Sequence, residues 1–409
     1  MIAKRDEEGE SLQFPKGFLW GAATSSHQVE GDNFHNDWWQ AEQEGKVPFK
    51  SGKACNHYEL FEEDFALAEK MNHNAHRFSI EWSRIEPEEG TWNMREVHHY
   101  RRVLQRLKDK GFKTFVTLHH FTNPLWFVSR GGWENKQAIF YFSRFARFIY
   151  EQLGELIDFC ITINEPLPYI AMGYREGLWP PFRRSDYISA FKVFNNMVLA
   201  HNQASKSIKL FNPKAKIGIA ANLIDFQPRH RWNPIDRLIS FLTDYFWNRL
   251  FLDRITKNTD FIGVNYYFHH HVHTAPFIFG KSHSGHEFSD MGWGIHPEGL
   301  YFVLKKACHY GKPLFVTENG IADAKDEKRV NFILGHLRYV YQAIQEGVDV
   351  RGYFYWSLMD NFEWADGFWP RFGLLEVDYK TMKRIFRPSS KVFSEICKRN
   401  GIPPTLMKI

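Results

Sequence analysis

Two glutamates follow short apolar runs, and a pair of carboxyl groups is suited to acid–base and nucleophilic chemistry. Glu165 follows the run Phe159–Ile163 in the segment ITINEP, and Glu318 follows Leu314–Thr317 in VTENG. In glycosidic cleavage, one carboxylic acid protonates the leaving oxygen while a second carboxylate attacks the anomeric carbon. We therefore take Glu165 and Glu318 as the candidate catalytic pair, although a lone glutamate at a strand end is more often a surface ion-pair partner.

Other polar and aromatic side chains stand in or just after further apolar runs. They are Gln28, Arg77, His120, Asn164, Asn222, Asn265, Tyr267 and Trp356, with Glu363 and Trp364 close behind the last. Each has an ordinary structural reading, since a lone histidine or tryptophan is usually core and Asn222 fits a turn. Because the set recurs on nearly every run, one shared pocket explains it better. Amides and His120 would bind sugar hydroxyls there, and Trp356 and Trp364 would form apolar walls.

Short β-rich runs alternate with longer amphipathic segments along the chain. The expected strands are Phe18–Ala22, Ala75–Ile80, Lys113–Leu118, Phe159–Ile163, Lys216–Ala221, Phe261–Asn265, Leu314–Thr317 and Gly352–Trp356. The expected helices include His57–Met71, Arg95–Lys110, Lys136–Leu153, Tyr187–Leu210, Pro297–His309 and Asp326–Glu346. Eight strands joined by right-handed crossovers close into a parallel barrel, whose chemistry gathers at the carboxyl ends of the strands.

We therefore expect an α/β protein with one domain over residues 1–409, a (β/α)8 TIM barrel with residues 1–13 as a flexible tail. No Pro/Ser-rich linker divides the 409 residues. An open doubly wound sheet is the alternative architecture. The first strand, however, leads into GAATSSHQVEG, which lacks the glycine pattern of a dinucleotide-binding turn.

Charge and hydropathy exclude several classes of partner. The formal net charge is only +5, and acidic and basic residues are interleaved without a block of like charges. We therefore expect neither nucleic acid nor a membrane as a partner. No stretch approaches 18 apolar residues, so no transmembrane helix is expected. The segment Met1–Glu10 lacks the apolar region of a secretory signal, which favours a cytoplasmic protein.

Cysteine usage agrees with a reducing compartment. The four cysteines are far apart and form no CxxC pair; they are Cys55, Cys160, Cys308 and Cys397. This spacing predicts neither a zinc ribbon nor a disulfide framework.

The motifs resemble those of the family 1 glycoside hydrolases, the β-glucosidase and β-galactosidase family, from about Phe14 to Cys397. They are FPKGFLWGAATSSHQVEG, HRFSIEWSRIEP, ITINEP, DFIGVNYY, VTENG and YWSLMDNFEWADGFWPRFGLLEVD. The resemblance implies a retaining β-glycosidase that releases terminal β-D-glycosyl residues from a small β-glycoside by double displacement. It implies no cofactor and no metal. A transglycosylase on the same site and a non-catalytic sugar-binding barrel are the alternatives, and the oligomeric state stays open.

The resemblance also implies roles for single residues. Glu165 matches the general acid/base and Glu318 the nucleophile, and a negative Glu318 would raise the pKa of Glu165. Asn164 would touch the 2-hydroxyl, while Arg77 and Tyr267 would orient Glu318. The expected substrate contacts are Gln28, His120, Phe121, Asn222, Asn265, Trp293, Trp356, Glu363, Trp364 and Phe372, with Trp293 on the aglycone side.

The carboxyl group of Glu363, at the inner end of the expected pocket, limits the range of sugars expected as substrates. Glu363 favours an unmodified sugar, because a carboxylate repels a sugar 6-phosphate. β-Glucosides, β-galactosides and β-fucosides all remain open as substrates.

Three features depart from the family pattern. The segment from Phe251 to Asp260 is shorter than usual, so we expect the barrel wall before the sixth strand to be thinned or missing. Phe121 and Leu167 stand where the family often has tryptophan, which keeps an apolar wall but loses N–H donors. The run from Tyr267 to His286 holds six histidines. They could bind a metal, although a polar loop near the mouth explains them better.

Overall fold

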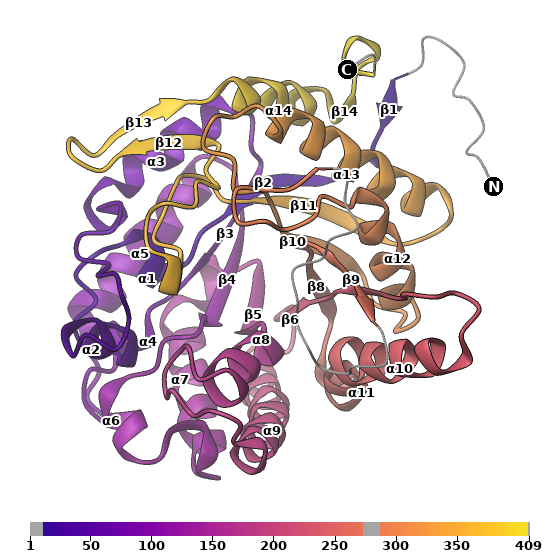
Figure 1. The fold of residues 1–409 in the computed structure, drawn as a ribbon. Helices are drawn as coiled ribbons and strands as arrows, with labels where there is room; N and C mark the ends of the chain where they lie inside the picture. The colour runs from indigo at the N-terminus through magenta and orange to yellow at the C-terminus, as the bar shows by residue number, and fades with distance from the viewer. Residues whose placement is uncertain (1–10, 273–286, 408–409) are drawn as a thin grey trace.

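A closed parallel barrel forms the body of the molecule. The computed structural model describes residues 11–272 and 287–407. The barrel strands follow one another as β2, β3, β4, β5, β6, β8, β10 and β11, and β11 pairs back onto β2 (Figure 1). Their bounds are β2 Leu19–Ala23, β3 Ala75–Ser79, β4 Lys113–His119, β5 Phe159–Asn164, β6 Ile217–Asn222, β8 Phe261–Asn265, β10 Leu314–Asn319 and β11 Val350–Trp356. The expected (β/α)8 barrel is confirmed, and the open sheet is excluded.

Long helices surround the barrel. They are α3 (His57–Lys70), α5 (Met94–Asp109), α7 (Ala138–Leu153), α9 (Tyr187–Phe211), α12 (Pro297–Cys308), α13 (Arg329–Gln345) and α14 (Pro388–Arg399). Shorter helices are α1 (Ser26–Val29), α2 (Asp37–Gln43), α4 (Trp82–Ile85), α6 (Leu125–Ser129) and α8 (Pro166–Ile170). Several of these helices begin with residues that favour a helix start: Asp186 accepts from the N–H of Ser189 at the start of α9, and prolines open α12 and α14. The six expected helices are confirmed, with α13 beginning at Arg329 rather than Asp326.

The wall before β8 is thin but present. After β6 the chain runs through β7 (Asp225–Pro228), α10 (Pro234–Asp244), the π-helical turn η4 (Tyr245–Arg249), α11 (Leu250–Ile255) and η5 (Thr256–Asn258). The strands β6 and β8 pair from Gly218–Phe261 to Asn222–Asn265, so the barrel is closed there. The short α11 contacts α9 and buries Phe251 and Leu252. The sequence analysis expected this wall to be either thinned or missing. It is thinned and not missing.

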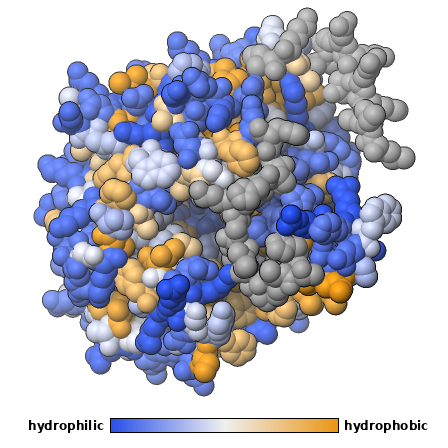
Figure 2. Space-filling view, viewed as in Figure 1, coloured by the Kyte–Doolittle hydropathy of each residue, from blue (hydrophilic) through white to orange (hydrophobic). Residues whose placement is uncertain are grey.

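Helix α10 lies away from the barrel strands. It packs on a separate two-stranded sheet of β7 and β9 (His269–Val272), which extends from the carboxyl ends of β6 and β8. Figure 2 shows orange apolar side chains at the lower right of this face, where Figure 1 places α10.

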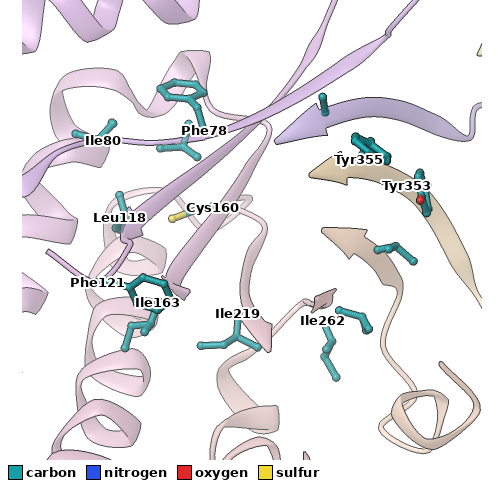
Figure 3. Close-up of a cluster of buried hydrophobic side chains, with 14 of the residues drawn as sticks. Phe78, Ile80, Leu118, Phe121, Cys160, Ile163, Ile219, Ile262, Tyr353 and Tyr355 are labelled. Carbon is teal, nitrogen blue, oxygen red and sulfur yellow. The ribbon is translucent and has the colours of Figure 1, made fainter. Parts of the chain in front are cut away.

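Two apolar layers hold the barrel. Figure 3 shows part of the outer layer, in which Phe78, Leu118 and Cys160 from neighbouring strands are buried in one cluster with residues of the surrounding helices. Inside the barrel the ring of Phe115 lies 5.0 Å from that of Phe315 and 4.7 Å from that of Phe354. These phenylalanines plug the barrel below the strand ends, which leaves only the carboxyl end open for chemistry.

The first and last strands of the described residues pair with each other in a separate two-stranded sheet. Strand β1 (Leu12–Gln13) pairs with β14 (Gly401–Ile402), and Leu12 is buried. Leu12 and Gln13 therefore belong to this strand pair and not to the expected flexible tail of residues 1–13, because the apolar side chain of Leu12 gains a buried position; residues 1–10 lie outside the described part. Strands β12 (Leu375–Asp378) and β13 (Lys383–Phe386) form a further hairpin. Within the described residues, no helix is long and apolar enough to cross a membrane.

Candidate active site

A cavity of about 760 Å³ opens at the carboxyl ends of the barrel strands. It brings together nearly all the residues that the sequence singles out. Those that line it are Gln28, His120, Phe121, Asn164, Glu165, Asn222, Tyr267, Trp293, Glu318, Trp356, Glu363, Trp364 and Phe372. The two others, Arg77 and Asn265, lie beneath the lining and hydrogen-bond to the two candidate glutamates.

The backbone at Glu165 is strained. Pro166 opens α8 directly after β5, and Glu165 between them takes a left-handed conformation with φ 43°. Two other lining residues, Phe121 and Trp364, also have positive φ values, of 73° and 50°. Each such residue costs on the order of 1–2 kcal/mol, and strain of this kind gathers where a side chain must be aimed.

Two donors converge on Glu318. The Arg77 guanidinium reaches Oε1 through Nη1 at 2.5 Å, and the Tyr267 hydroxyl donates to Oε2 at 2.6 Å. Arg77 and Glu318 are both buried. Removing either partner of a buried ion pair leaves an uncompensated charge, so the two residues depend on each other.

Glu165 has a different environment, made of neutral amides. Asn265 and Asn222 donate through Nδ2 to its Oε1 at 2.9 and 3.2 Å. Thr317 fixes the Asn265 amide by donating to its Oδ1 at 2.7 Å. Burial, followed by the negative charge of Glu318, raises the pKa of Glu165 to about 8. A carboxyl group with this pKa carries its proton at neutral pH.

Asn164 hydrogen-bonds to one partner of each glutamate, Arg77 for Glu318 and Asn265 for Glu165. Its Oδ1 accepts from Nη2 of Arg77 at 2.6 Å and from Nδ2 of Asn265 at 3.2 Å. Its Nδ2 lies 3.4 Å from Nε2 of His120. Burial and the charge of Arg77 hold the pKa of His120 well below its usual range, so this imidazole is neutral.

Gln28 and Glu363 form a second polar group in the cavity. The Gln28 amide donates to Oε2 of Glu363 at 3.3 Å and to Oδ1 of Asn361 at 3.1 Å. Burial, with the nearby charges of Asp366 and Glu318, raises the pKa of Glu363 to about 8. Two carboxyl groups of the cavity thus share an elevated pKa, and both face the same small volume.

Aromatic rings wall the cavity. The His120 ring is stacked on those of Trp356 and Trp364, at 6.0 and 6.1 Å between centroids. Phe121 lies 5.3 Å from Trp364, so it forms part of this apolar wall as expected. Flat apolar faces beside convergent amides and carboxylates are suited to a sugar ring.

The family to which this arrangement belongs follows from comparison with known proteins. The sequence model described as "Glycosyl hydrolase family 1" matches residues 10–259 and 248–402. The chain belongs to glycosyl hydrolase family 1. The two matches overlap at residues 248–259, where the sequence analysis places the shortened segment. As a member of the family the protein is a β-glycosidase, and the retaining mechanism is general to that family.

Relatives within family 1 are similar over their whole length. A β-glycosidase structure from Pyrococcus horikoshii matches with a TM-score of 0.93 and 44% identity, covering 98% of both chains. Beta-glucosidase A of Thermotoga maritima is 34% identical over 95% of this chain and 99% of its own length. A beta-galactosidase of Pyrococcus woesei is 32% identical, with coverage of 95% and 98%.

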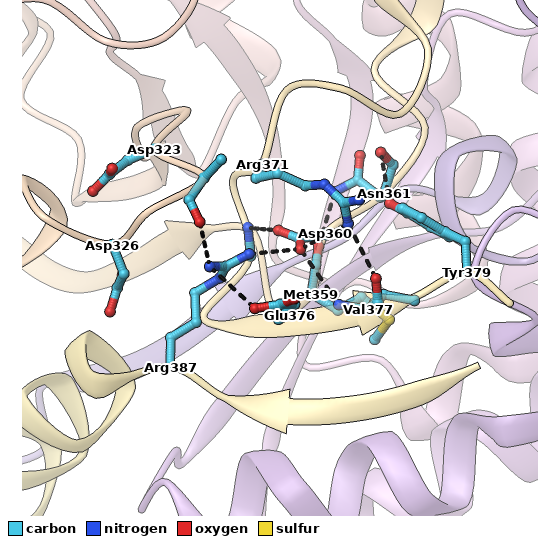
Figure 4. Close-up of polar contacts among 12 residues, drawn as sticks. Asp323, Asp326, Met359, Asp360, Asn361, Arg371, Glu376, Val377, Tyr379 and Arg387 are labelled. Atoms are coloured by element: carbon cyan, nitrogen blue, oxygen red, sulfur yellow. Dashed lines mark hydrogen bonds and ion pairs between the residues drawn. The ribbon is translucent and has the colours of Figure 1, made fainter. Parts of the chain in front are cut away.

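A buried carboxylate outside the cavity anchors the loop that carries Glu363. Asp360 follows β11 and accepts hydrogen bonds from Arg387 at 2.8 Å, Arg371 at 3.2 Å and the N–H of Gly373 at 2.9 Å (Figure 4). It is fully buried and does not line the cavity. In this family 1 enzyme Asp360 therefore holds the loop in place.

Apart from Trp293, the sequence analysis missed the outer part of the cavity. The larger of the additional apolar lining residues are Met172, Leu178, Trp179, Ile224, Trp247, Phe268 and Met291. Most are half-buried, and Leu178 is exposed, so they form a rim around the deeper polar residues. They come from loops and short helical turns after the strands. Only the tryptophans carried a usable signal, as large aromatic residues in loops beyond β5 and β6.

The histidine run has a structural place. His269, His270 and His271 belong to β9, so this part is a strand and not the expected loop. The ring of His269 lies 4.0 Å from that of His296, and burial lowers the pKa of His269 to about 3. Among the described residues, no group of three or more His, Cys, Asp or Glu could hold a metal ion. His273, His283 and His286 lie outside the described residues.

Proposed function

We propose that this family 1 enzyme hydrolyses terminal non-reducing β-D-glucosyl residues, and related β-galactosyl and β-fucosyl residues, of small glycosides. The names of its relatives in Thermotoga maritima and Pyrococcus woesei support glucosides and galactosides. The cavity supports a single sugar at its deep end, where buried amides, carboxyl groups and tryptophans converge. The half-buried apolar rim supports an apolar or aromatic aglycone.

Their different surroundings give Glu165 the role of acid and Glu318 the role of nucleophile. Glu165 holds a proton among neutral amides, so it protonates the glycosidic oxygen as the bond from that oxygen to the anomeric carbon breaks. Glu318, between Arg77 and Tyr267, forms a bond to the anomeric carbon through a carboxylate oxygen. The alcohol leaves with the proton of Glu165, and the sugar remains as an ester on Glu318.

The second step reverses these roles. Once the ester has formed, the negative charge of Glu318 is gone, and the pKa of Glu165 falls because that charge raised it. Glu165 then takes a proton from water while the water oxygen bonds to the anomeric carbon. The bond from that carbon to Glu318 breaks, which restores both carboxyl groups.

The observation that carries this assignment is the contrast between a glutamate bound by a guanidinium and one bound by amides. The substitution Glu165→Ala tests it through kcat/KM on two β-glucosides. An alkyl glucoside needs acid assistance and should lose about a thousandfold or more, whereas a 2,4-dinitrophenyl glucoside should lose less than about tenfold. Equal losses on both substrates would contradict an acid role.

A second carboxylate of the same cavity serves as the matched control. Glu176 also lines the cavity, and its side chain is more exposed than that of Glu165. We expect Glu176→Ala to change both substrates by the same small factor. If this variant also lost more kcat/KM on the alkyl glucoside than on the dinitrophenyl glucoside, the difference would come from a change in the electrostatic field of the cavity. It would then not be evidence for proton donation by Glu165.

We also propose that the enzyme works in the cytoplasm. All four cysteines are free, and three of them are buried. Free thiols without bridges support a reducing compartment. Fractionation of the source cells, with activity measured in each fraction, tests this assignment.

A further inference from the structure

Helix α10 turns two of its polar residues inward and most of its apolar residues outward. Asp236 and Ser240 are buried, whereas Leu238 and Phe241 have exposed fractions of 57% and 60%. An amphipathic helix of a globular protein normally turns its apolar stripe toward the core. The orientation of α10 is the opposite, so its outer stripe is not explained by packing within the described part of the chain.

Hydrogen bonds hold α10 in this orientation. Asp236 accepts from Nδ1 of His230 at 2.7 Å, and the Ser240 hydroxyl donates to the carbonyl of Phe226 at 3.2 Å. At the end of the helix Asp244 accepts from Lys306 at 2.6 Å. Rolling the helix to bury its apolar stripe would leave these polar groups without partners, which costs free energy. The outward stripe is therefore a stable feature of the fold.

The stripe is continuous along α10 and its flanks. We call the set the α10 apolar face; its exposed members are Trp232, Ile235, Leu238, Phe241, Leu242 and Phe246. Trp232 is 97% exposed. Scattered exposed apolar residues need no explanation, but a contiguous group of this kind marks an interaction surface.

Basic residues border the α10 apolar face. Arg229, Arg231 and Arg237 are exposed, together with His230. Cations beside exposed tryptophan, leucine and phenylalanine fit a surface that is both anionic and apolar. A second copy of this chain is a poorer match, because a two-fold contact through this face would bring the same arginines toward each other.

We propose that the α10 apolar face docks on an anionic lipid surface. The apolar side chains enter the boundary between headgroups and acyl chains, and the arginines bind the lipid phosphates. Docking at a surface requires no spanning helix. It goes beyond the charge pattern of the sequence, which shows no basic block and led us to expect no membrane partner.

Docking would set the active site at the lipid surface. Trp247, in the turn that follows α10, lines the cavity and donates through Nε1 to the carbonyl of Asn222 at 3.2 Å. Asn222 in turn donates to Glu165. The apolar rim of the cavity therefore lies beside the docked face. Amphiphilic β-glycosides could then enter the site from the lipid, a consequence that rests on the proposed function.

Sedimentation with vesicles tests the docking without any substrate. We expect the full chain to partition onto vesicles of equal parts phosphatidylglycerol and phosphatidylcholine at least about tenfold more strongly than onto pure phosphatidylcholine. The double variant Leu238→Ser/Phe241→Ser should lower partitioning onto the mixed vesicles by about tenfold or more. The charge variant Arg231→Glu/Arg237→Glu should do the same and abolish the lipid preference.

A matched control separates the face from exposed apolar residues in general. Leu210, at the carboxyl end of α9, is 84% exposed and does not belong to the α10 apolar face. We expect Leu210→Ser to bind vesicles like the unmodified chain. Hydrolysis of a soluble aryl β-glucoside checks folding in every variant, and a failure there alone would count against the proposed function and not against docking.

Three outcomes would overturn the docking proposal. The first is no binding to anionic vesicles, and the second is equal binding by the double variant and the unmodified chain. The third is a dimer, measured by mass photometry, that Leu238→Ser/Phe241→Ser converts to monomer, since the face would then be a contact between copies. If the double variant does not fold, the charge variant and Leu238→Ser alone keep the test decisive.

Discussion

The floor and the rim of the active-site cavity are built on opposite principles. On the floor, Glu318 and Glu165 are buried, and each is held by directed hydrogen bonds from two other side chains. At the rim, Met172 and Phe268 are half-buried and present apolar surface. Directed bonds fix atoms to within tenths of an ångström, whereas apolar contact is tolerant of position. The floor is thus suited to chemistry on one sugar, and the rim to binding varied aglycones.

The largest effect should come from the floor. In Glu318→Gln the attacking carboxylate is lost while the shape of the side chain is kept, so we expect kcat/KM to fall by about 10⁴-fold or more on any β-glycoside. Steady-state rates on an aryl and an alkyl glucoside measure it. A loss below about a hundredfold on both substrates would show that the floor does not supply the nucleophile from this position.

The floor also predicts rejection of phosphorylated sugars. Among the described residues that line the cavity, Arg175 is the only arginine, and it lies near the rim. The deep end holds Glu363 and a neutral His120. We expect kcat/KM for an aryl β-glucoside to exceed that for its 6-phosphate by at least about tenfold. Because the pKa of Glu363 is raised to about 8, the group is neutral below that pH and charged above it. The preference should therefore widen between pH 6 and pH 9.

Glu363→Gln is the matched variant for this preference. It removes the titrating charge and keeps the size of the side chain, so the ratio between the two substrates should become smaller and lose its pH dependence. A preference for the 6-phosphate in the unmodified enzyme would contradict the assignment of Glu363 to the sugar site.

Sequence reasoning reached the floor but, apart from Trp293, not the apolar rim, for a physical reason. Floor residues such as Asn164 and Glu318 stand at the ends of β-strands, and a parallel barrel brings all strand ends to one opening. Rim residues such as Met172 and Trp247 stand in π-helical turns, η3 (Ala171–Arg175) and η4, that no hydrophobic period marks. Their positions depend on tertiary packing of the loops.

Helix α10 shows a second limit of the same kind. The spacing of Ile235, Leu238 and Leu242 is that of an amphipathic helix, and such a pattern is ordinarily taken to face the core. The structure turns it outward because the opposite side supplies Asp236 and Ser240 to buried hydrogen bonds. Hydrophobic periodicity predicts that a helix has two faces, but not which of them is covered.

The proton on Glu165 predicts a pH dependence of kcat/KM that differs between alkyl glucosides and aryl glucosides with a good leaving group. The acid form is required, and its pKa is about 8, so kcat/KM for an alkyl glucoside should fall as the pH rises through 8. Asn222 stabilises the charged form by donating to Glu165. Asn222→Ala should therefore raise this pKa and move the alkaline limb upward by a fraction of a pH unit. A 2,4-dinitrophenyl glucoside is the internal control, because its first step needs little acid. A downward shift of the limb in the variant would contradict the hydrogen bond as its cause.

The smallest effect should come from the rim. Phe268→Ala removes apolar surface next to Trp293, so kcat/KM for octyl β-glucoside should fall about threefold to tenfold while that for methyl β-glucoside stays nearly constant. Phe211→Ala is the matched control, since Phe211 is exposed outside the cavity. Initial rates on both glucosides, well below saturation, measure the ratio. If Phe268→Ala lowered both substrates equally, the ring would be supporting the floor through Trp293 and Tyr267, and the separation between a directed floor and a tolerant rim would not hold at this point.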